Sequence, residues 1–424
     1  MRLHHLVIDV APLRSSRDFR FLFAARVVSL LGLGLSTVAL PVQVYGLTGS
    51  SLQVAGVAAV LGGSALLATL AGGVLADRYD RRRLILLARG TAAVVFAVLA
   101  LNAALPEPRL WVVHACAAVN GGTAVSNAAL TAATPALVGR DRLVAAGALV
   151  ALSVEIGAVV GPTLAGVVVA GPGLATGYAL TSAASVVTVL LVARIRPLPP
   201  EPAGKGMAQV GRGIRDGAAF VVRDWTVGGL LLVDVFALVF ALPYVLFPQL
   251  ADEVFGGGPA VVGLLYSAPP AGALMAALVS GWTGHVRRAG RALVALVAVY
   301  AVAVLGFGAC ALLVERGAVA PVAGLVAGVG SLAVAGAARM SSDVLRRGLL
   351  QAHTPDHLQG RVSSAWLAQV MLSPTVGGVQ AGLAARLLGP ALGITVGAVV
   401  CLAGTAVAAL ALPAVRRATL PVRR

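Results

Sequence analysis

Apolar runs of about 20 residues recur along this 424-residue chain from about Phe19 to Leu412, and short stretches rich in arginine, glycine and proline separate them. A helix of that length crosses a hydrocarbon core of about 30 Å. At roughly 35 residues for a helix and its loop, the chain has room for about twelve spans, so the pattern predicts an all-α membrane protein. We place the spans at residues 19–45, 52–76, 84–105, 110–134, 143–170, 173–194, 225–250, 259–284, 291–314, 318–342, 361–386 and 390–412.

The chain also carries a weak internal repeat with an offset of roughly half its length. The repeated pairs are Pro41 and Pro248, Gly56 and Gly263, and Arg81 and Arg288. Such a repeat is typical of two parallel halves of six helices with a substrate path between them. We expect a cytoplasmic N-terminus at 1–18, a first half at 19–194, a central loop at 195–224, a second half at 225–412 and a cytoplasmic tail at 413–424.

The central loop has two parts of different character. It opens on an Arg-Pro-Leu-Pro-Pro-Glu-Pro run that cannot be helical. Residues 213–222 then place Ile214, Ala218 and Val221 at helical spacing among arginines. We expect a short amphipathic helix on the cytoplasmic surface there, with a solvated linker as the alternative.

The placement of arginine predicts the orientation. Arginines gather at both termini and in or beside the loops that lead from even-numbered to odd-numbered spans. Arg339, at the end of the predicted tenth span, and Arg346, beyond it, are counted among those that flank the loop between the tenth and eleventh spans. The opposite face carries Arg109, Arg316 and Arg386. By the positive-inside rule, both termini are expected in the cytoplasm. This bias also accounts for the net charge of +16 without any nucleic-acid partner.

Composition argues against a soluble enzyme, because 59% of the residues are apolar and only 11% are charged, against about 25% charged in soluble domains. The single lysine, Lys205, lies in no phosphate-binding loop, which argues against an ATP-driven pump. His353 and His357 have a metal-ligand spacing, but Pro355 breaks the helix that would align them. We therefore expect no catalytic residue, no metal site and no cofactor.

The most specific motif lies between the second and third spans, where residues 72–83 read Gly-Gly-Val-Leu-Ala-Asp-Arg-Tyr-Asp-Arg-Arg-Arg. An acid and several arginines in a short loop can lock neighbouring helix ends, and Asp77 can pair with Arg81. The alternative is a plain positive-inside loop. The motif resembles the loop signature of the major facilitator superfamily, Gly-x-Leu-Ala-Asp-Arg-x-Gly-Arg-Lys, and departs from it at Asp80. The resemblance implies a major facilitator fold and a cytoplasmic gate formed by Gly73, Asp77, Arg78, Arg81 and Arg82.

A second motif lies in the fifth span. Small residues four apart let helices approach closely, and a proline kinks the helix. The residues are Gly157, Gly161, Pro162 and Gly166. This Gly-x-x-x-Gly-Pro pattern resembles the antiporter motif of the superfamily, which implies export rather than import.

Several longer stretches resemble bacterial superfamily members that export enterobactin, a catecholate siderophore. The stretches are Pro41–Val44, Ile85–Thr91, Leu101–Pro108, Ala133–Arg140, Gly360–Val362 and Trp366–Gln369. The resemblance implies a siderophore exporter in the bacterial cytoplasmic (inner) membrane. Related members export macrolides and other drugs, so multidrug or macrolide efflux is the alternative.

Charged residues within the predicted spans are the candidates for coupling and substrate binding. Arg26, Glu155 and Asp234 are expected to face a cavity or a partner, because a central charge costs about 2.5–3.5 kcal/mol on insertion scales. The two carboxylates can carry a coupling proton, or they form structural ion pairs; Arg26 can instead snorkel to the interface. Asn120 and Asn127 share one face of the fourth span and line the cavity or bind a neighbouring helix. The expected partners are a small-molecule substrate, protons and lipid, with the protein acting as a monomer.

Overall fold

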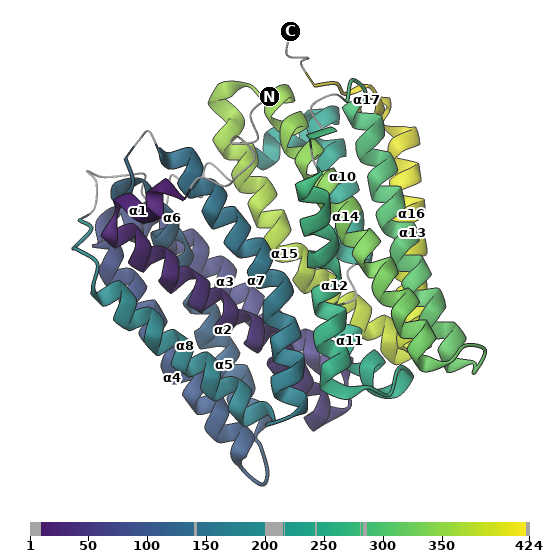
Figure 1. The fold of residues 1–424 in the computed structure, drawn as a ribbon. Helices are drawn as coiled ribbons and strands as arrows, with labels where there is room; N and C mark the ends of the chain where they lie inside the picture. The colour runs from purple at the N-terminus through teal and green to yellow at the C-terminus, as the bar shows by residue number, and fades with distance from the viewer. Residues whose placement is uncertain are drawn as a thin grey trace. The chain divides into compact units, whose positions relative to one another are not determined.

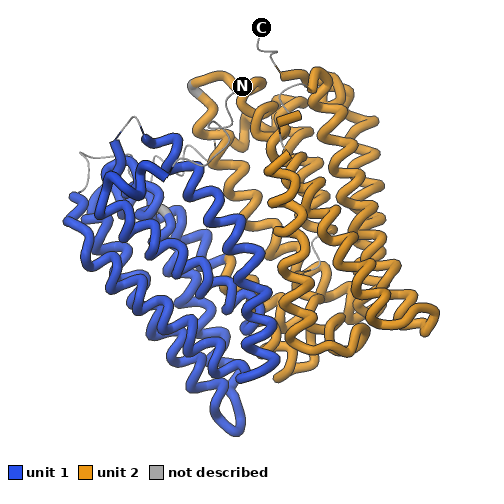
Figure 2. Tube along the Cα trace, viewed as in Figure 1, with its two compact units in different colours: residues 1–40, 63–207 blue, residues 41–62, 208–424 orange. Residues whose placement is uncertain are grey.

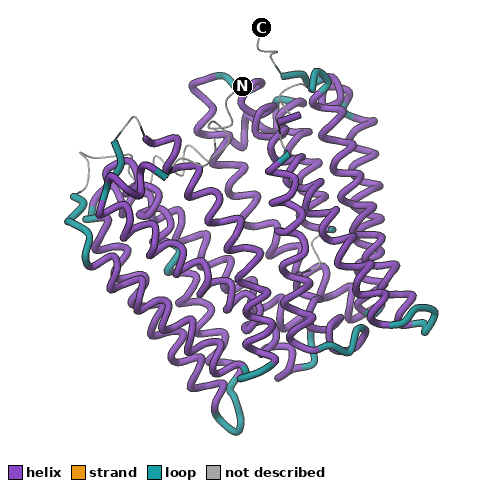
Figure 3. Tube along the Cα trace, viewed as in Figure 1, coloured by secondary structure: helices purple, strands orange, loops and turns teal. Residues whose placement is uncertain are grey.

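The computed structural model describes residues 10–139, 142–199, 215, 217–241, 244–279, 281–282 and 286–420. Throughout these ranges the regular secondary structure is helical, as Figure 3 shows. The chain separates into two compact units, shown in Figure 2. Unit 1 comprises residues 1–40 and 63–207, and unit 2 comprises residues 41–62 and 208–424.

The helices that carry unit 1 run from the N-terminus to residue 193 (Figure 1). They are α1 (Ala11–Ser15), α2 (Arg17–Thr48), α3 (Ser51–Arg78), α4 (Arg81–Ala104), α5 (Leu110–Gly122), α6 (Val125–Leu137), α7 (Leu143–Ala170) and α8 (Leu174–Ala193). The end of α2 and the start of α3 belong to unit 2. A buried cluster of aromatic and aliphatic side chains from α2, α4 and α6, including Phe19, Ile85 and Leu130, forms part of the core of unit 1.

The remaining elements belong to unit 2. They are α10 (Trp225–Phe240), the 3-10 turn η3 (Tyr244–Leu246), α11 (Phe247–Gln249), the π-turn η4 (Leu250–Val254), α12 (Gly258–Leu278), α13 (Ala289–Glu315), α14 (Pro321–His353), α15 (Asp356–Leu388), α16 (Pro390–Ala411) and α17 (Pro413–Arg417). Residues 217–223 are also helical and overlap the predicted amphipathic helix at 213–222; residues 200–214 and 216 lie outside the described part.

Among the described residues, ten helices are long and apolar enough to cross a membrane. They include neither the α5–α6 region nor α15, which were predicted as the fourth and eleventh spans. The α5 and α6 helices have 13 residues each, and α15 carries a polar N-terminal part. The all-α membrane fold is confirmed, while the number of twelve spans stays a prediction.

The predicted fourth span is not one continuous helix. Thr123 and Ala124 interrupt it between α5 and α6. There the backbone N–H groups of Thr123 and Ala124 bind carbonyls three residues earlier, and the Thr123 hydroxyl donates to Asn120 O at 2.7 Å. Two glycines precede the break, and hydroxyl-to-carbonyl bonds compete with the helical ladder. Asn120 and Asn127 therefore lie on either side of a break rather than on one helix face.

The predicted seventh span is also interrupted. The α10 helix ends at Phe240, and the chain continues from Tyr244 through 3-10, α and π turns to Val254. Pro248 supplies no backbone N–H, which disfavours a regular helix across this segment. The Phe255 N–H binds Leu250 O at 2.9 Å, which closes the π turn.

Candidate functional site

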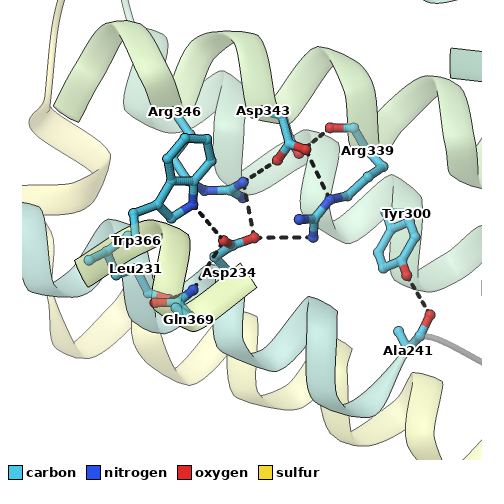
Figure 4. A network of polar contacts seen from close by, with 10 residues as sticks. Leu231, Asp234, Ala241, Tyr300, Arg339, Asp343, Arg346, Trp366 and Gln369 are labelled. Atoms are coloured by element: carbon cyan, nitrogen blue, oxygen red, sulfur yellow. Dashed lines mark hydrogen bonds and ion pairs between the residues drawn. The ribbon is translucent and has the colours of Figure 1, made fainter. Parts of the chain in front are cut away.

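A buried carboxylate on α10 lies at the centre of a charged network in unit 2 (Figure 4). The Asp234 side chain has no solvent exposure, and its Oδ1 lies 3.0 Å from Arg346 Nη1 and 3.1 Å from Arg339 Nη1. Both arginines come from α14, seven residues apart and hence on one helix face. Asp234 thus forms ion pairs with two guanidinium groups, as the ion-pair alternative from the sequence predicts.

A second carboxylate completes this network. Asp343 Oδ2 lies 3.2 Å from Arg339 Nε, and Asp343 Oδ1 accepts a hydrogen bond from Arg346 Nη1. The formal charges of two aspartates and two arginines cancel. Cancellation matters here because an unmatched ion costs several kcal/mol to bury.

The other oxygen of Asp234 is bound by α15. Trp366 Nε1 donates to Asp234 Oδ2 at 3.2 Å, and Gln369 Nε2 donates to the same oxygen at 3.0 Å. Gln369 Nε2 also contacts Leu231 O at 3.2 Å (Figure 4). Trp366 and Gln369 are three positions apart, so they share a face of α15. The Asp234 carboxylate therefore joins α10, α14 and α15.

The sequence identifies Asp234 but misses its partners. Arg339 and Arg346 were counted with the arginines that flank a cytoplasmic loop, whereas α14 continues to His353 and buries Arg346 completely. The predicted end of the tenth span at residue 342 is wrong, because α14 extends well beyond the apolar window. The spacing of Arg339, Asp343 and Arg346 at i, i+4 and i+7 is the signal that could have shown a helical ion-pair network.

A cavity of about 140 Å³ lies next to this network, between α14 and α15. The Trp366 ring forms part of its wall, and the Arg347 guanidinium lies 5.3 Å from the centroid of that ring. The ring therefore contacts the cavity, while its indole N–H binds Asp234. The cavity is lined by Arg347, Leu350, Gln351, Thr354, Gln359, Val362, Ser363 and Trp366.

Unit 1 has its own group of polar side chains inside the helices. Arg89 on α4 is buried, and its Nη2 lies 3.4 Å from Asn127 Oδ1 on α6. Arg26 on α2 is half-buried, and Asn127 is exposed. The structure thus joins Asn127, predicted as a cavity residue, to Arg89, which sequence reasoning did not single out.

Glu155 on α7 is half-buried. Across the described residues, no ion pair or hydrogen bond of its carboxylate is present, in contrast to Asp234. The sequence analysis gave Glu155 and Asp234 the same two alternatives, but of these two acids only Asp234 lies in an ion-pair network.

The motif between α3 and α4 binds helix ends. Arg81 Nη1 donates to Ala132 O at 3.0 Å, and Arg82 Nη2 donates to Ala193 O at 2.6 Å. Ala193 is the last residue of α8, and cations favour such C-terminal carbonyls, whereas Ala132 lies within α6. Asp80, which departs from the family pattern, caps α4: its Oδ1 accepts hydrogen bonds from the Arg82 and Arg83 backbone N–H groups.

Within the described part, Asp77 forms no pair with Arg81. Gly73 and Arg78 are exposed near the end of α3.

The glycine motif of α7 contacts α2. A Cβ placed on Gly161 would lie 2.7 Å from Gly34 Cα, and one on Gly157 would lie 3.0 Å from Leu30 Cβ. The backbones of α2 and α7 therefore cross almost in contact, which larger residues would prevent. Pro162 and Gly166 are buried in the same helix.

Comparisons with known proteins agree with this architecture. The family model of the Major Facilitator Superfamily matches residues 22–365. The Enterobactin exporter EntS of Salmonella typhimurium is 36% identical over 387 residues, which cover 91% of this chain and 89% of that protein. The protein of the same name from Escherichia coli O1:K1 / APEC is 34% identical over 385 residues, with the same coverage.

Solved structures show the same fold at low sequence identity. A POT family transporter crystallised with a thioalcohol-conjugated peptide has a TM-score of 0.71 at 12% identity, covering 94% of this chain and 96% of that one. The nucleoside transporter NupG has a TM-score of 0.68 at 13% identity, covering 94% and 98%. With the family match over most of the chain, these findings show that the chain belongs to the Major Facilitator Superfamily and is a multi-pass membrane transporter.

Proposed function

We propose that this protein exports a catecholate siderophore of the enterobactin type from the cytoplasm, by alternating access and in exchange for protons. The observation that carries the proposal is the 36% identity to an enterobactin exporter over 91% of the chain. The Gly34–Gly161 crossing of α2 and α7 supports export, since it coincides with the antiporter-like motif. In this proposal the protein is a monomer of twelve spans in the bacterial inner membrane and has no nucleic-acid partner.

Within this proposal the charged residues have separate roles. Glu155 carries the coupling proton, because it is a half-buried acid within a membrane-spanning helix and forms no ion pair with the described residues. Asp234 is a structural acid that holds α10, α14 and α15 together. Arg81 and Arg82 bind helix ends in unit 1 and form the cytoplasmic gate with Gly73, Asp77 and Arg78.

The function is tested with a deletion strain of the source bacterium grown in iron-poor medium. We expect the secreted siderophore to fall several-fold and the intracellular siderophore, or its breakdown products, to rise. Expression of the wild-type protein from a plasmid should restore secretion. Unchanged secretion, together with new sensitivity to macrolides or dyes, would contradict the proposal and favour drug efflux.

A further inference from the structure

Two arginines of unit 1 lie on helices that share one buried apolar cluster. Arg89 is 5% exposed on α4, and Arg26 is half-buried on α2. Arg26 directly follows Ala25, and Arg89 lies one turn beyond Ile85, two residues of the same buried apolar cluster. The two arginines therefore extend from helices that pack on one buried apolar cluster.

No carboxylate balances this pair among the described residues. The ion pairs found there involve Asp18, Asp234 and Asp343, and none includes Arg26 or Arg89. The Nε atoms of both arginines are buried without an acceptor. The network in unit 2 is the opposite case, because there two arginines are matched by two aspartates. The unit 1 pair lacks the negative charge that such burial demands.

The chemistry of the pair defines the missing ligand. Guanidinium groups bind planar groups with two adjacent oxygens through paired, charge-assisted hydrogen bonds. The amide of Asn127, which already contacts Arg89, adds both donors and an acceptor. An ionised catechol has an anionic oxygen for the arginines and an adjacent hydroxyl for the amide oxygen.

We propose that Arg26, Arg89 and Asn127 form a binding site in unit 1 for a catechol group of the cargo, bound as its monoanion. This inference rests on the proposed siderophore export. On binding, one catechol O–H bond breaks, its proton passes to bulk water, and the oxygen keeps the electron pair. The anionic oxygen then supplies the negative charge that the two arginines lack.

The test is calorimetric titration of the purified full-length protein in detergent with iron-free enterobactin. We expect Arg89→Gln to weaken binding about tenfold or more, as loss of charge-assisted hydrogen bonds implies. We expect Arg89→Lys to retain part of the affinity, because it keeps the charge but not the planar fork. Repeating the titration in buffers of different ionisation enthalpy should show about one proton released by the wild type and less by Arg89→Gln.

The control is Arg83→Gln, which removes an exposed arginine from the same helix and should leave binding unchanged. Arg89→Gln should melt no lower than the wild type without ligand, because it removes an unbalanced buried charge. A lower melting temperature would reveal a counter-ion within the protein and overturn the inference. Enterobactin binding that is independent of Arg89 would overturn it while leaving siderophore export standing.

Inorganic phosphate is titrated in parallel as the probe for a small anion. Binding of phosphate that depends on Arg89 and is not displaced by enterobactin would assign the site to an inorganic anion and overturn the inference. A wild-type protein that binds no enterobactin at all would contradict the siderophore proposal itself, and the inference with it.

Discussion

At the residue scale, the two membrane carboxylates are in opposite environments, and this difference predicts opposite mutant phenotypes. Asp234→Asn leaves two arginines facing one aspartate in the interior of unit 2. We expect a loss of about 3–5 kcal/mol in the free energy of unfolding, as for other broken buried pairs.

Glu155→Gln removes no ion pair of the described structure, so we expect an unchanged melting temperature but loss of the dependence of transport on a pH gradient.

The measurements are thermal unfolding in detergent and siderophore flux into inverted vesicles with and without an imposed pH gradient. The double variant Asp234→Asn with Arg339→Gln should recover part of the stability, because it restores equal numbers of opposite charges. If Glu155→Gln keeps the wild-type pH dependence, Glu155 is not the proton carrier.

A functional residue can be predicted from the sequence where it is a charged residue within a long apolar run. Asp234 stands out because it lies in a long apolar run, and the sequence alone identifies it. Its partners Arg339 and Arg346 do not stand out, since Arg339 lies at the end of the predicted tenth span and Arg346 lies beyond it. Only the continuation of α14 to His353 makes both of them part of one helix. Arg89 was missed for a similar reason: it lies near other arginines of a cytoplasmic loop, and its burial depends on packing between α4 and α6.

At the element scale, the crossing of α2 and α7 predicts a site where one methyl group matters. A Cβ on Gly161 would lie 2.7 Å from Gly34 Cα, a contact that backbones cannot absorb without moving apart. We expect Gly161→Ala to lower the melting temperature, consistent with about 1–3 kcal/mol for overpacking, and to slow transport. Thermal unfolding and vesicle flux are the measurements.

Gly147→Ala is the matched control, because it lies on α7 as well and its added Cβ meets no atom within 4 Å. This control should be neutral or slightly stabilising, since alanine favours helices. Equal behaviour of the two variants would mean that the crossing does not limit packing or motion.

Helix ends were predictable only in part. The start of α4 follows from the arginine run, and Asp80 fixes it as an N-cap. The breaks after Gly122 and Phe240 were not predicted, because both lie in continuous apolar stretches where hydropathy is uniform. They arise from hydroxyl-to-carbonyl bonds and from proline, whose effects are local.

At the scale of the whole molecule, charge is arranged differently in the two units. Unit 2 neutralises the buried Arg346 and its neighbour Arg339 with aspartates, whereas Arg26 and Arg89 of unit 1 form no ion pair with a described carboxylate. A negatively charged cargo would therefore be favoured in unit 1, while unit 2 keeps a network of cancelling charges. This asymmetry could not be inferred from the repeat, which relates backbone markers such as Pro41 and Pro248 but not charges.

The orientation of the whole chain is a consequence of the same arginines. Because they gather at the termini and on one set of loops, we expect both termini in the cytoplasm and the loop after α4 outside. Single cysteines are introduced at Ala104, which is exposed at the end of α4, and at Gly204, which lies outside the described residues, after replacing the three native cysteines with alanine. An impermeant maleimide added to intact spheroplasts should label Ala104→Cys, and it should label Gly204→Cys only after the membrane is permeabilised. Labelling of Gly204→Cys from outside would reverse the topology, and with it the direction in which the site in unit 1 receives its cargo.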